Sequence, residues 1–489
     1  MTRSDRCADN VPPRKTAALG PAANRFDQHQ SGSLRRRASV WPPNGKSLNG
    51  NRSQEVAIAM VKTISAAAIL LAASAMAAVA GTTVLTVGGS SGQYATISAA
   101  VAAADSDTNL ADYYVISIAP GTYTNDSPQV TRPMTIQAAV PGSAVILNAS
   151  APLANEKGII LTDAGLTVEG LTLENANIAN SLGGNAAGIR PEKGNQNYTL
   201  TVRNTTFIHN QTGILTDVNF PLDVVLVENV FINNGNLNPP SGGTTHGIYI
   251  GANNQSLVAM GNEFCGTNVG HDIKSRASIN MIENNTLYDG AADPNQSTCM
   301  LGSSSYALDL PNGGVAVVVG NTMIRGTASE TNVLFAYGEE GLTYTTNSIA
   351  FLDNIMDNTG GTAIGISDAP NPPIPVVGSG NQFASSISPQ VNPASADQLT
   401  ANSTGSVSPD GTILTAPSTG SLMTTAGTWT FGTVQPQAGQ YQIFLNGSYT
   451  SGYAAEMEVD GGGKLYAYNS GSRAWWLWNG GGWTQVSGP

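Results

Sequence analysis

One short phrase recurs along the middle of this chain, and it constrains the fold more than any other feature. Each copy has apolar residues, an asparagine, a spacer and a large apolar residue, as in TVRNTTF, LVENVF and VVGNTM. The repeated asparagines are Asn204, Asn229, Asn262, Asn285, Asn321, Asn354 and Asn381. Successive copies lie 23 to 36 residues apart. Such spacing is typical of a solenoid with one phrase per coil and loop insertions in some coils.

Stacked coils give a physical reason for the asparagine. A turn between two short strands needs a residue that tolerates left-handed backbone geometry, and asparagine does so. Its side-chain amide can also bond to the asparagine of the next coil. We therefore predict an all-β solenoid over residues 81–400, with an asparagine ladder inside it beside columns of Val, Ile, Leu and Phe.

The segment before the repeats has a different pattern. Ile97, Val101 and Ala104 mark a short amphipathic helix, and the apolar strand that follows ends at the turn of Pro120 and Gly121. A helix here would cap the open end of the solenoid, where unpaired strand edges invite aggregation.

The run GQYATISAAVAAA, then VISIAPGTY, then asparagine-marked coils resembles the pectin lyase-like superfamily over about residues 83–400. That superfamily includes pectate and pectin lyases, β-helical alginate lyases, polygalacturonases and pectin methylesterases. The resemblance implies a right-handed parallel β-helix that works on polysaccharide. It does not fix the reaction.

The two ends of the chain differ from the repeats. Residues 60–80 look like a signal peptide that ends at an A-x-A cleavage site, so we expect a secreted protein, acting as a monomer. The apolar run there is too short for a good membrane span. Residues 1–59 are basic and aperiodic, either a start codon assigned too early or a disordered leader. Residues 401–427 resemble a linker or a last coil, and 428–489 a small Trp-rich β module.

Charge excludes nucleic acid as a partner. Residues 1–80 contain 11 of the 21 lysines and arginines but only four of the 33 acids, so 10 bases face 29 acids in the remainder. An acidic chain lacks the basic surface that phosphates require.

Two features of the mature chain leave alternatives open. Cys265 and Cys299 form either a disulfide or two buried free thiols. Trp475, Trp476, Trp478 and Trp483 form either a sugar-binding platform or the apolar core of a small domain, and the shortage of other large apolar residues there favours the core.

Candidate site residues come from aligning the coils on a central apolar residue, as in AGIRP, HGIYI, HDIKS, YALDL and FAYGE. With side chains alternating along a strand, the next residue in each coil faces outward. This predicted outward column is Arg190, Leu215, Tyr249, Lys274, Asp309 and Tyr337. Tyr249 and Tyr337 could stack on sugar rings, and Arg190 could bind substrate.

The same alternation places Asp272, Lys274 and Arg276 on one outward face, with Asp309 beside Lys274. Lys274 and Arg276 are two of only ten basic residues after residue 80, and acids surround them. This clustering suggests a site for uronate elimination, in which a base removes the proton at C5 while the adjacent carboxylate is neutralised. By resemblance to β-helical lyases, Lys274 would be the base and Arg276 the carboxylate clamp or proton donor. Asp272, Asp309 and Glu339 would hold calcium. A plain ladder of salt bridges, Lys274 with Asp309 and Arg276 with Asp272, is the structural alternative.

Other functions stay open. A β-helical glycoside hydrolase would need two carboxyl groups, such as Asp309 with Asp272 or Glu339. A non-catalytic polysaccharide-binding or adhesion protein would only display the surface. His246 and His271 occupy equivalent places in successive coils, either as substrate or metal contacts or as stacked imidazoles that bond to the backbone.

Overall fold

The computed structural model describes most of the chain after Ala80. The described residues are 81–149, 153–192, 197–216, 221–236, 245–252, 254–391, 398–399, 408, 411–418, 420–424, 426–445, 448–460, 464–479 and 482–489. The predicted leader at 1–59 and signal peptide at 60–80 lie outside these residues. No helix in the described part of the chain is long and apolar enough to span a membrane.

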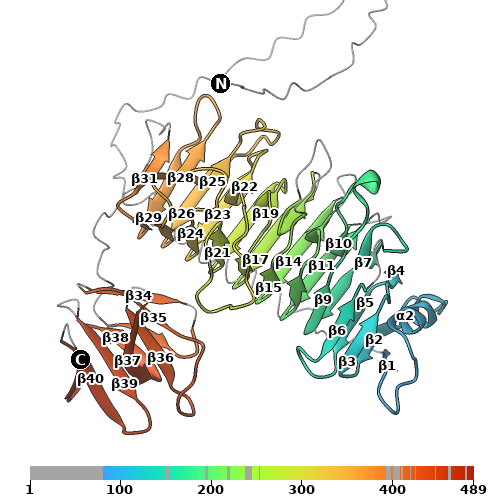
Figure 1. Ribbon diagram of the computed structural model, residues 1–489, viewed down its shortest axis with the longest axis horizontal. Coiled ribbons are helices and arrows are strands. Elements are labelled where there is room, and N and C mark those ends of the chain that lie inside the picture. Colours follow the sequence, from blue (N-terminus) through green and yellow to red (C-terminus); the bar gives the residue numbers. More distant parts are fainter. Residues whose placement is uncertain are drawn as a thin grey trace, which may run out of the picture. The chain divides into compact units, whose positions relative to one another are not determined.

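Residues 82–399 form a right-handed parallel β-helix with three long sheets (Figure 1). Sheet A has twelve strands: β1 (Thr82–Val87), β2 (Tyr113–Ile118), β5 (Met134–Ala138), β8 (Leu166–Glu169), β11 (Tyr198–Arg203), β14 (Leu222–Val227), β17 (Ser256–Met260), β20 (Ile279–Glu283), β23 (Val315–Val319), β26 (Ser348–Leu352), β29 (Val376–Ser379) and β32 (Gln398–Leu399). Sheet B has ten: β3 (Gly121–Thr124), β6 (Ala144–Leu147), β9 (Leu171–Glu174), β12 (Thr206–Ile208), β15 (Val230–Ile232), β18 (Glu263–Cys265), β21 (Thr286–Asp289), β24 (Thr322–Arg325), β27 (Ile355–Asn358) and β30 (Gln382–Phe383). Sheet C has ten: β4 (Gln129–Val130), β7 (Gly158–Thr162), β10 (Ala187–Pro191), β13 (Thr212–Leu215), β16 (Ile248–Ile250), β19 (His271–Ser275), β22 (Tyr306–Leu310), β25 (Val333–Tyr337), β28 (Ala363–Asp368) and β31 (Ile387–Val391). The predicted fold is thus confirmed.

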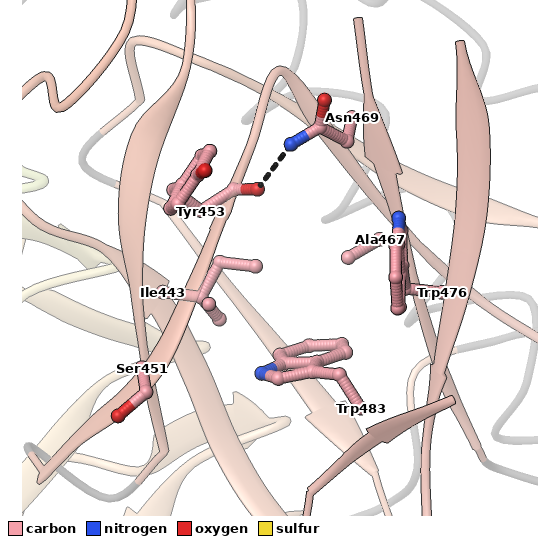
Figure 2. Close-up of a pocket in the computed structure, with 8 residues that line it drawn as sticks. Ile443, Ser451, Tyr453, Ala467, Asn469, Trp476 and Trp483 are labelled. Carbon is pink, nitrogen blue, oxygen red and sulfur yellow. Dashed lines mark hydrogen bonds between the residues drawn. The ribbon is translucent and has the colours of Figure 1, made fainter. Parts of the chain in front are cut away.

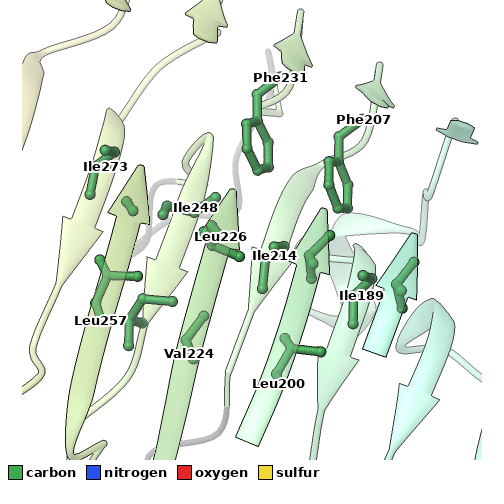
Figure 3. Close-up of a cluster of buried hydrophobic side chains, with 14 of the residues drawn as sticks. Ile189, Leu200, Phe207, Ile214, Val224, Leu226, Phe231, Ile248, Leu257 and Ile273 are labelled. Carbon is green, nitrogen blue, oxygen red and sulfur yellow. The ribbon is translucent and has the colours of Figure 1, made fainter. Parts of the chain in front are cut away.

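The core is made of inward columns, because equivalent residues of successive coils pair in register (Figure 3). Ile189, Ile214 and Ile248 follow one another along sheet C, and all are fully buried. Phe207, Phe231 and Phe264 stack along sheet B with ring centroids 4.6 and 4.4 Å apart. A single coil could not bury these side chains, whereas a stack of coils does.

The asparagine ladder is present inside the solenoid. Asn229, Asn262, Asn285, Asn321, Asn354 and Asn381 are almost completely buried. Each of the first five donates its backbone N–H and its side-chain Nδ2 to the Oδ1 of the next asparagine, at 2.9–3.1 Å. Nδ2 also donates to a backbone carbonyl of the preceding coil, as from Asn285 to Ala259 at 2.9 Å. The ladder therefore satisfies buried backbone groups at every turn.

Asn204 is the exception. It has a positive φ of 48°, and its neighbour Thr205 occupies the ladder position instead, because Thr205 N–H donates to Asn229 Oδ1. In later coils too, the left-handed residue precedes the ladder asparagine, for example Glu228 before Asn229 and Asn284 before Asn285. The prediction that one asparagine both adopts the left-handed turn and forms the ladder was wrong. Two adjacent columns of residues do this, one for the turn and one for the ladder.

The predicted capping helix is α2 (Ile97–Asp105). Its buried residues include Ile97, Val101 and Ala104, as the sequence indicated. Thr96 caps its N-terminus by accepting from Ala99 N–H, and the Asp126 carboxylate accepts from the N–H groups of Ile97 and Ser98 at 2.5 and 3.0 Å. A carboxylate at this end is favourable for the helix dipole.

The C-terminal module is a separate pair of antiparallel sheets with its own core. Sheet D contains β33 (Thr412–Thr415), β38 (Glu456–Val459), β39 (Leu465–Asn469), β40 (Ala474–Trp478) and β41 (Trp483–Val486). Sheet E contains β34 (Ser421–Thr424), β35 (Gly427–Phe431), β36 (Tyr441–Leu445) and β37 (Ser448–Ala454). Residues 412–415 and 421–424, which the sequence suggested as linker or last coil, pair within these sheets, so the module begins before residue 428.

Candidate functional site

Strands β19 and β22 bring Lys274 and Asp309 together. The two residues are register partners, and Lys274 Nζ lies 2.8 Å from Asp309 Oδ2. Their predicted adjacency is therefore confirmed. Their expected exposure was wrong, because the side chain of Lys274 is only 11% exposed and that of Asp309 is completely buried. Asp309 Oδ1 has no hydrogen-bond partner among the described residues.

A carboxylate that the sequence analysis overlooked joins the two bases. Glu340 lies 3.1 Å from Lys274 Nζ and 2.7 Å from the Arg276 guanidinium. Arg276 also donates through Nε to the Tyr249 hydroxyl at 2.8 Å and through Nη1 to Asn312 Oδ1 at 2.6 Å. One carboxylate is thus held by a lysine and an arginine at the same time, through charge-assisted hydrogen bonds.

Glu340 belongs to a segment, residues 338–347, that covers the pair. The Tyr344 hydroxyl donates to the backbone carbonyl of Arg276, and Asn347 Oδ1 accepts from Gly314 N–H at 2.8 Å. Gly338 starts the segment with φ of 71°, and a Cβ there would lie 2.6 Å from the Pro370 ring. Only glycine fits such a turn without strain. The Glu340 side chain is 45% exposed, so solvent reaches this ion pair.

His246 and His271 form an aromatic stack with Tyr306. The His246 and His271 rings, and the His271 and Tyr306 rings, each have centroids 4.8 Å apart. His246 Nδ1 accepts the backbone N–H of His271 at 3.1 Å, and His271 Nε2 lies 3.3 Å from Asp309 Oδ2. This matches the stacked-imidazole alternative. It also makes His271 a positioning contact for Asp309.

The pKa values follow from burial and from this charge network. Burial lowers the pKa of Lys274, but the carboxylates of Asp309 and Glu340 outweigh burial and raise it. Burial raises the pKa of Asp309 to about 7 despite Lys274. Burial also acts on Glu340, but Arg276 and Lys274 lower its pKa overall. Burial together with neighbouring positive charge lowers the pKa of His271 well below 6.5, so this imidazole is neutral.

Tyr337 does not belong to the outward column. The register pairs Asp309 with Ala336 and Leu308 with Phe335, one residue away from the sequence alignment. Tyr337 is fully buried in the core, where its hydroxyl donates to Gly314 O at 2.5 Å. The reason is that Phe335, a larger apolar residue than Ala336, fills the inward position. The prediction of Tyr337 as a sugar contact was therefore wrong.

Arg190 faces outward but is apart from the cluster. It lies level with Leu215 on the neighbouring strand, and Leu215 in turn pairs with Tyr249. Its guanidinium donates to Glu192 at 2.8 Å and to the Asn185 carbonyl. The structure does not connect it to Lys274 or Arg276.

Asp272 has a different environment from the one expected. It is completely buried, and both carboxylate oxygens are without a hydrogen-bond partner among the described residues. Burial and the neighbouring Asp289 raise its pKa well above 3.8. Arg276 pairs with Glu340 instead of with Asp272.

The predicted calcium ligands do not fit a calcium site. Asp272 is completely buried, and Lys274 Nζ lies 2.8 Å from Asp309 Oδ2. Glu339 accepts from the Tyr306 hydroxyl at 3.3 Å. Calcium needs six to eight oxygen ligands that converge on one point, and in the described part of the chain these three acids do not converge.

A second acidic cluster lies on sheet B. Ligand atoms of Glu263, Asp293 and Cys265 come within 4.8 Å of one another. Cys265 is bonded to Cys299 in a disulfide with Cα atoms 5.9 Å apart, so its sulfur is not a thiolate ligand. Burial and Asp293 raise the pKa of Glu263 to about 8. The disulfide resolves the alternative that the sequence left open.

Sequence reasoning missed Glu340, Asn312 and Tyr344, which complete the cluster around Arg276. Glu340 stands beside the predicted Glu339 in a Gly-Glu-Glu-Gly turn. That turn was the available signal, because it begins an insertion between β25 of sheet C and β26 of sheet A.

Comparisons with known proteins are distant. No family model matches the chain, and no curated protein matches it. Among solved structures it is similar to a mutant of a PL6 family alginate lyase, with 15% identity and a TM-score of 0.33 over 65% of this chain and 38% of that one. It is also similar to the pectin methylesterase from Aspergillus niger, with 12% identity and a TM-score of 0.29 over 66% of this chain and 91% of that one. A third similar structure is ORF18 of Geobacillus virus E2, with 12% identity and a TM-score of 0.32 over 78% of this chain and 69% of that one. The chain thus spans well under half the length of the alginate lyase.

Proposed function

We propose that this protein is a secreted enzyme that cleaves a uronic-acid-containing polysaccharide by β-elimination. The observation that carries the proposal is the shared grip of Lys274 and Arg276 on the Glu340 carboxylate. A uronate carboxylate that replaced Glu340 would meet the Arg276 cation, and its sugar ring would then lie within reach of Lys274. Neutralising that carboxylate stabilises the enolate-like state formed when the C5 proton leaves.

In this proposal the Lys274 amine, once deprotonated, takes the C5 proton, and Arg276 holds the carboxylate. The electron pair forms the C4–C5 double bond, the C4–O bond breaks, and the leaving oxygen takes a proton from water. Asp309 and His271 position Lys274 from beneath. Because the geometry does not fit calcium, no step passes through a metal.

The first experiment separates elimination from hydrolysis. The purified mature chain is incubated with polygalacturonate, with alginate and with a neutral galactan. Elimination gives an unsaturated product that absorbs at about 235 nm. We expect this absorbance with at least one uronate polymer and none with galactan. New reducing ends without absorbance would indicate a hydrolase. The absence of both signals would contradict an enzymatic function.

The second experiment tests Glu340 as a stand-in for substrate. Glu340→Gln removes the competing negative charge, so KM for the uronate polymer should fall by about fivefold, the effect of a partly exposed ion pair. Glu330→Gln, on a neighbouring loop, is the matched control and should leave KM unchanged. An unaltered or increased KM in Glu340→Gln would contradict the displacement of Glu340 by substrate.

A hydrolase is the second candidate, and one observation favours it. Burial raises the pKa of Glu339, whereas Arg276 and Lys274 hold that of the adjacent Glu340 below its ordinary value despite burial. Carboxyl groups pushed in opposite directions are the pattern of a general acid and its anionic partner. Reducing ends that disappear in Glu339→Gln, without absorbance at about 235 nm, would support this function.

A further inference from the structure

We propose that the C-terminal module binds an uncharged sugar ring in a cavity between its two sheets. The cavity has a volume of about 200 Å³ and is lined from β36 and β37 on one side and from β39, β40 and β41 on the other (Figure 2). It is smaller than the roughly 300 Å³ at which drug-sized ligand pockets begin, so it suits a single ring. This inference rests on the module alone and goes beyond the function proposed for the β-helix.

The tryptophans of the module divide into core and cavity residues. Trp429, Trp478 and Trp483 pack against one another, with ring centroids 5.3–5.8 Å apart. Trp475 lies 5.2 Å from the Tyr468 ring. Trp476 lines the cavity and, within the described residues, has neither a ring partner nor a hydrogen bond to its indole. Trp429 and Trp478 thus pack in the core, Trp476 lines the cavity, and Trp483 does both.

A second wall of the cavity is fixed in place. Trp483 Nε1 donates to the backbone carbonyl of Thr450 at 3.2 Å. The ring lies so close to Gly452 that a Cβ there would be 2.4 Å from the indole nitrogen. Glycine is thus required beneath the ring. Two aromatic walls, one of them immobilised before any ligand arrives, suit the flat C–H faces of a pyranose.

The backbone beside the cavity is irregular. The pairing of β36 with β37 shifts register between Ile443 and Phe444, and Ser451 has a positive φ of 60°. Bulges of this kind redirect side chains and are frequent next to functional sites. A serine in left-handed geometry costs free energy, and residues strained in this way are found more often at binding sites than in ordinary strands.

The polar groups of the cavity suit hydroxyls better than carboxylates. The Tyr453 hydroxyl accepts from Gln437 Nε2 at 3.1 Å, which leaves its own O–H free to donate. Asn469 Nδ2 donates weakly to the Tyr453 carbonyl at 3.4 Å, so a better acceptor could recruit it. None of the residues that line the cavity is charged. A uronate would lose hydration of its carboxylate here without gaining a cation, so the structure favours a neutral sugar.

Affinity electrophoresis of the full mature chain tests this. The gels contain a neutral polymer, either β-glucan, galactan or mannan, or a charged one, either polygalacturonate or alginate. We expect retardation in at least one neutral gel, and about tenfold weaker retardation for Trp476→Ala, the loss of one stacking face. Trp475→Ala, on the same strand but away from the cavity, is the matched control and should be retarded like the unaltered chain.

Three results would overturn the proposal: no retardation in any neutral gel, retardation in uronate gels alone, or equal retardation of Trp476→Ala. If near-UV circular dichroism shows Trp476→Ala to be misfolded, Tyr453→Phe replaces it. Oxidation of Trp476 in the unaltered chain by N-bromosuccinimide, mapped by peptide mass spectrometry, gives a further measure. The retarding polymer should slow that oxidation, and failure to do so contradicts the site. Because the gels report binding without cleavage, this proposal and the elimination proposal fail separately.

Discussion

The asparagine ladder and the cluster around Lys274 use polar residues in opposite ways. The ladder repeats one uncharged residue in six coils, and each amide is bonded to the coils on either side. The cluster uses different ionisable residues from three coils and a covering segment, and it leaves Asp309 Oδ1 and His271 Nδ1 without partners among the described residues. The ladder therefore stabilises one structure. The cluster contains contacts that a ligand can exchange.

The largest expected effect comes from removing the base of the cluster. Lys274→Ala should lower elimination by about 10²- to 10⁴-fold, the range for loss of a general base. The rate of increase in absorbance at about 235 nm measures it. Lys157→Ala removes a lysine that is paired to Glu192 at 3.4 Å on the same sheet and serves as the control. Full activity in a folded Lys274→Ala variant would refute the assignment of the base.

Acidity gives the next effect, because the base must be deprotonated. The carboxylates of Asp309 and Glu340 raise the pKa of Lys274 against the opposing effect of burial. Below that pKa, each decrease of one pH unit lowers the deprotonated fraction of Lys274 about tenfold. The value of kcat/KM should therefore rise about tenfold for each unit by which the pH increases into the alkaline range. A profile that is flat from pH 7 to 9, or that falls, would rule out Lys274 as the group that accepts the proton.

In the ladder, by contrast, a substitution should affect stability and not chemistry. Asn285→Ala removes the acceptor for Asn262 N–H and Nδ2 and the donor to Ala259 O. Each buried group left unpaired costs about 1–3 kcal/mol, so the free energy of unfolding should fall by at least about 3 kcal/mol. Urea titration followed by fluorescence measures it. Asn332→Ala, at an exposed asparagine, should change little, and equal losses in both variants would contradict the ladder's importance.

The same contrast explains what the sequence could predict. A feature that repeats in many coils can be recognised even if one copy is misread, so the ladder and the parallel sheets were predictable. The error at Asn204, which lies one residue before the ladder position, did not change that prediction. The cluster depends on single positions. One residue of misalignment moved Tyr337 from the surface to the core, because a strand alternates at every residue. Glu340 contacts Lys274 and Arg276 from an insertion between two strands. The period of the repeats does not predict which residues an insertion contacts.

The smallest effect tests the carboxyl pair of Glu263, which follows the ladder residue Asn262, and Asp293. Burial and Asp293 raise the pKa of Glu263 from 4.5 to about 8. Between these pH values the folded chain binds more protons than the unfolded chain does, so stability falls as pH rises. We expect this pair to account for about 2 kcal/mol of that fall, because solvent access weakens the full effect. Glu263→Gln and Asp293→Asn should each flatten the dependence of urea midpoint on pH between 5 and 8. An unchanged slope in both variants would contradict the raised pKa of Glu263 and the part of Asp293 in raising it.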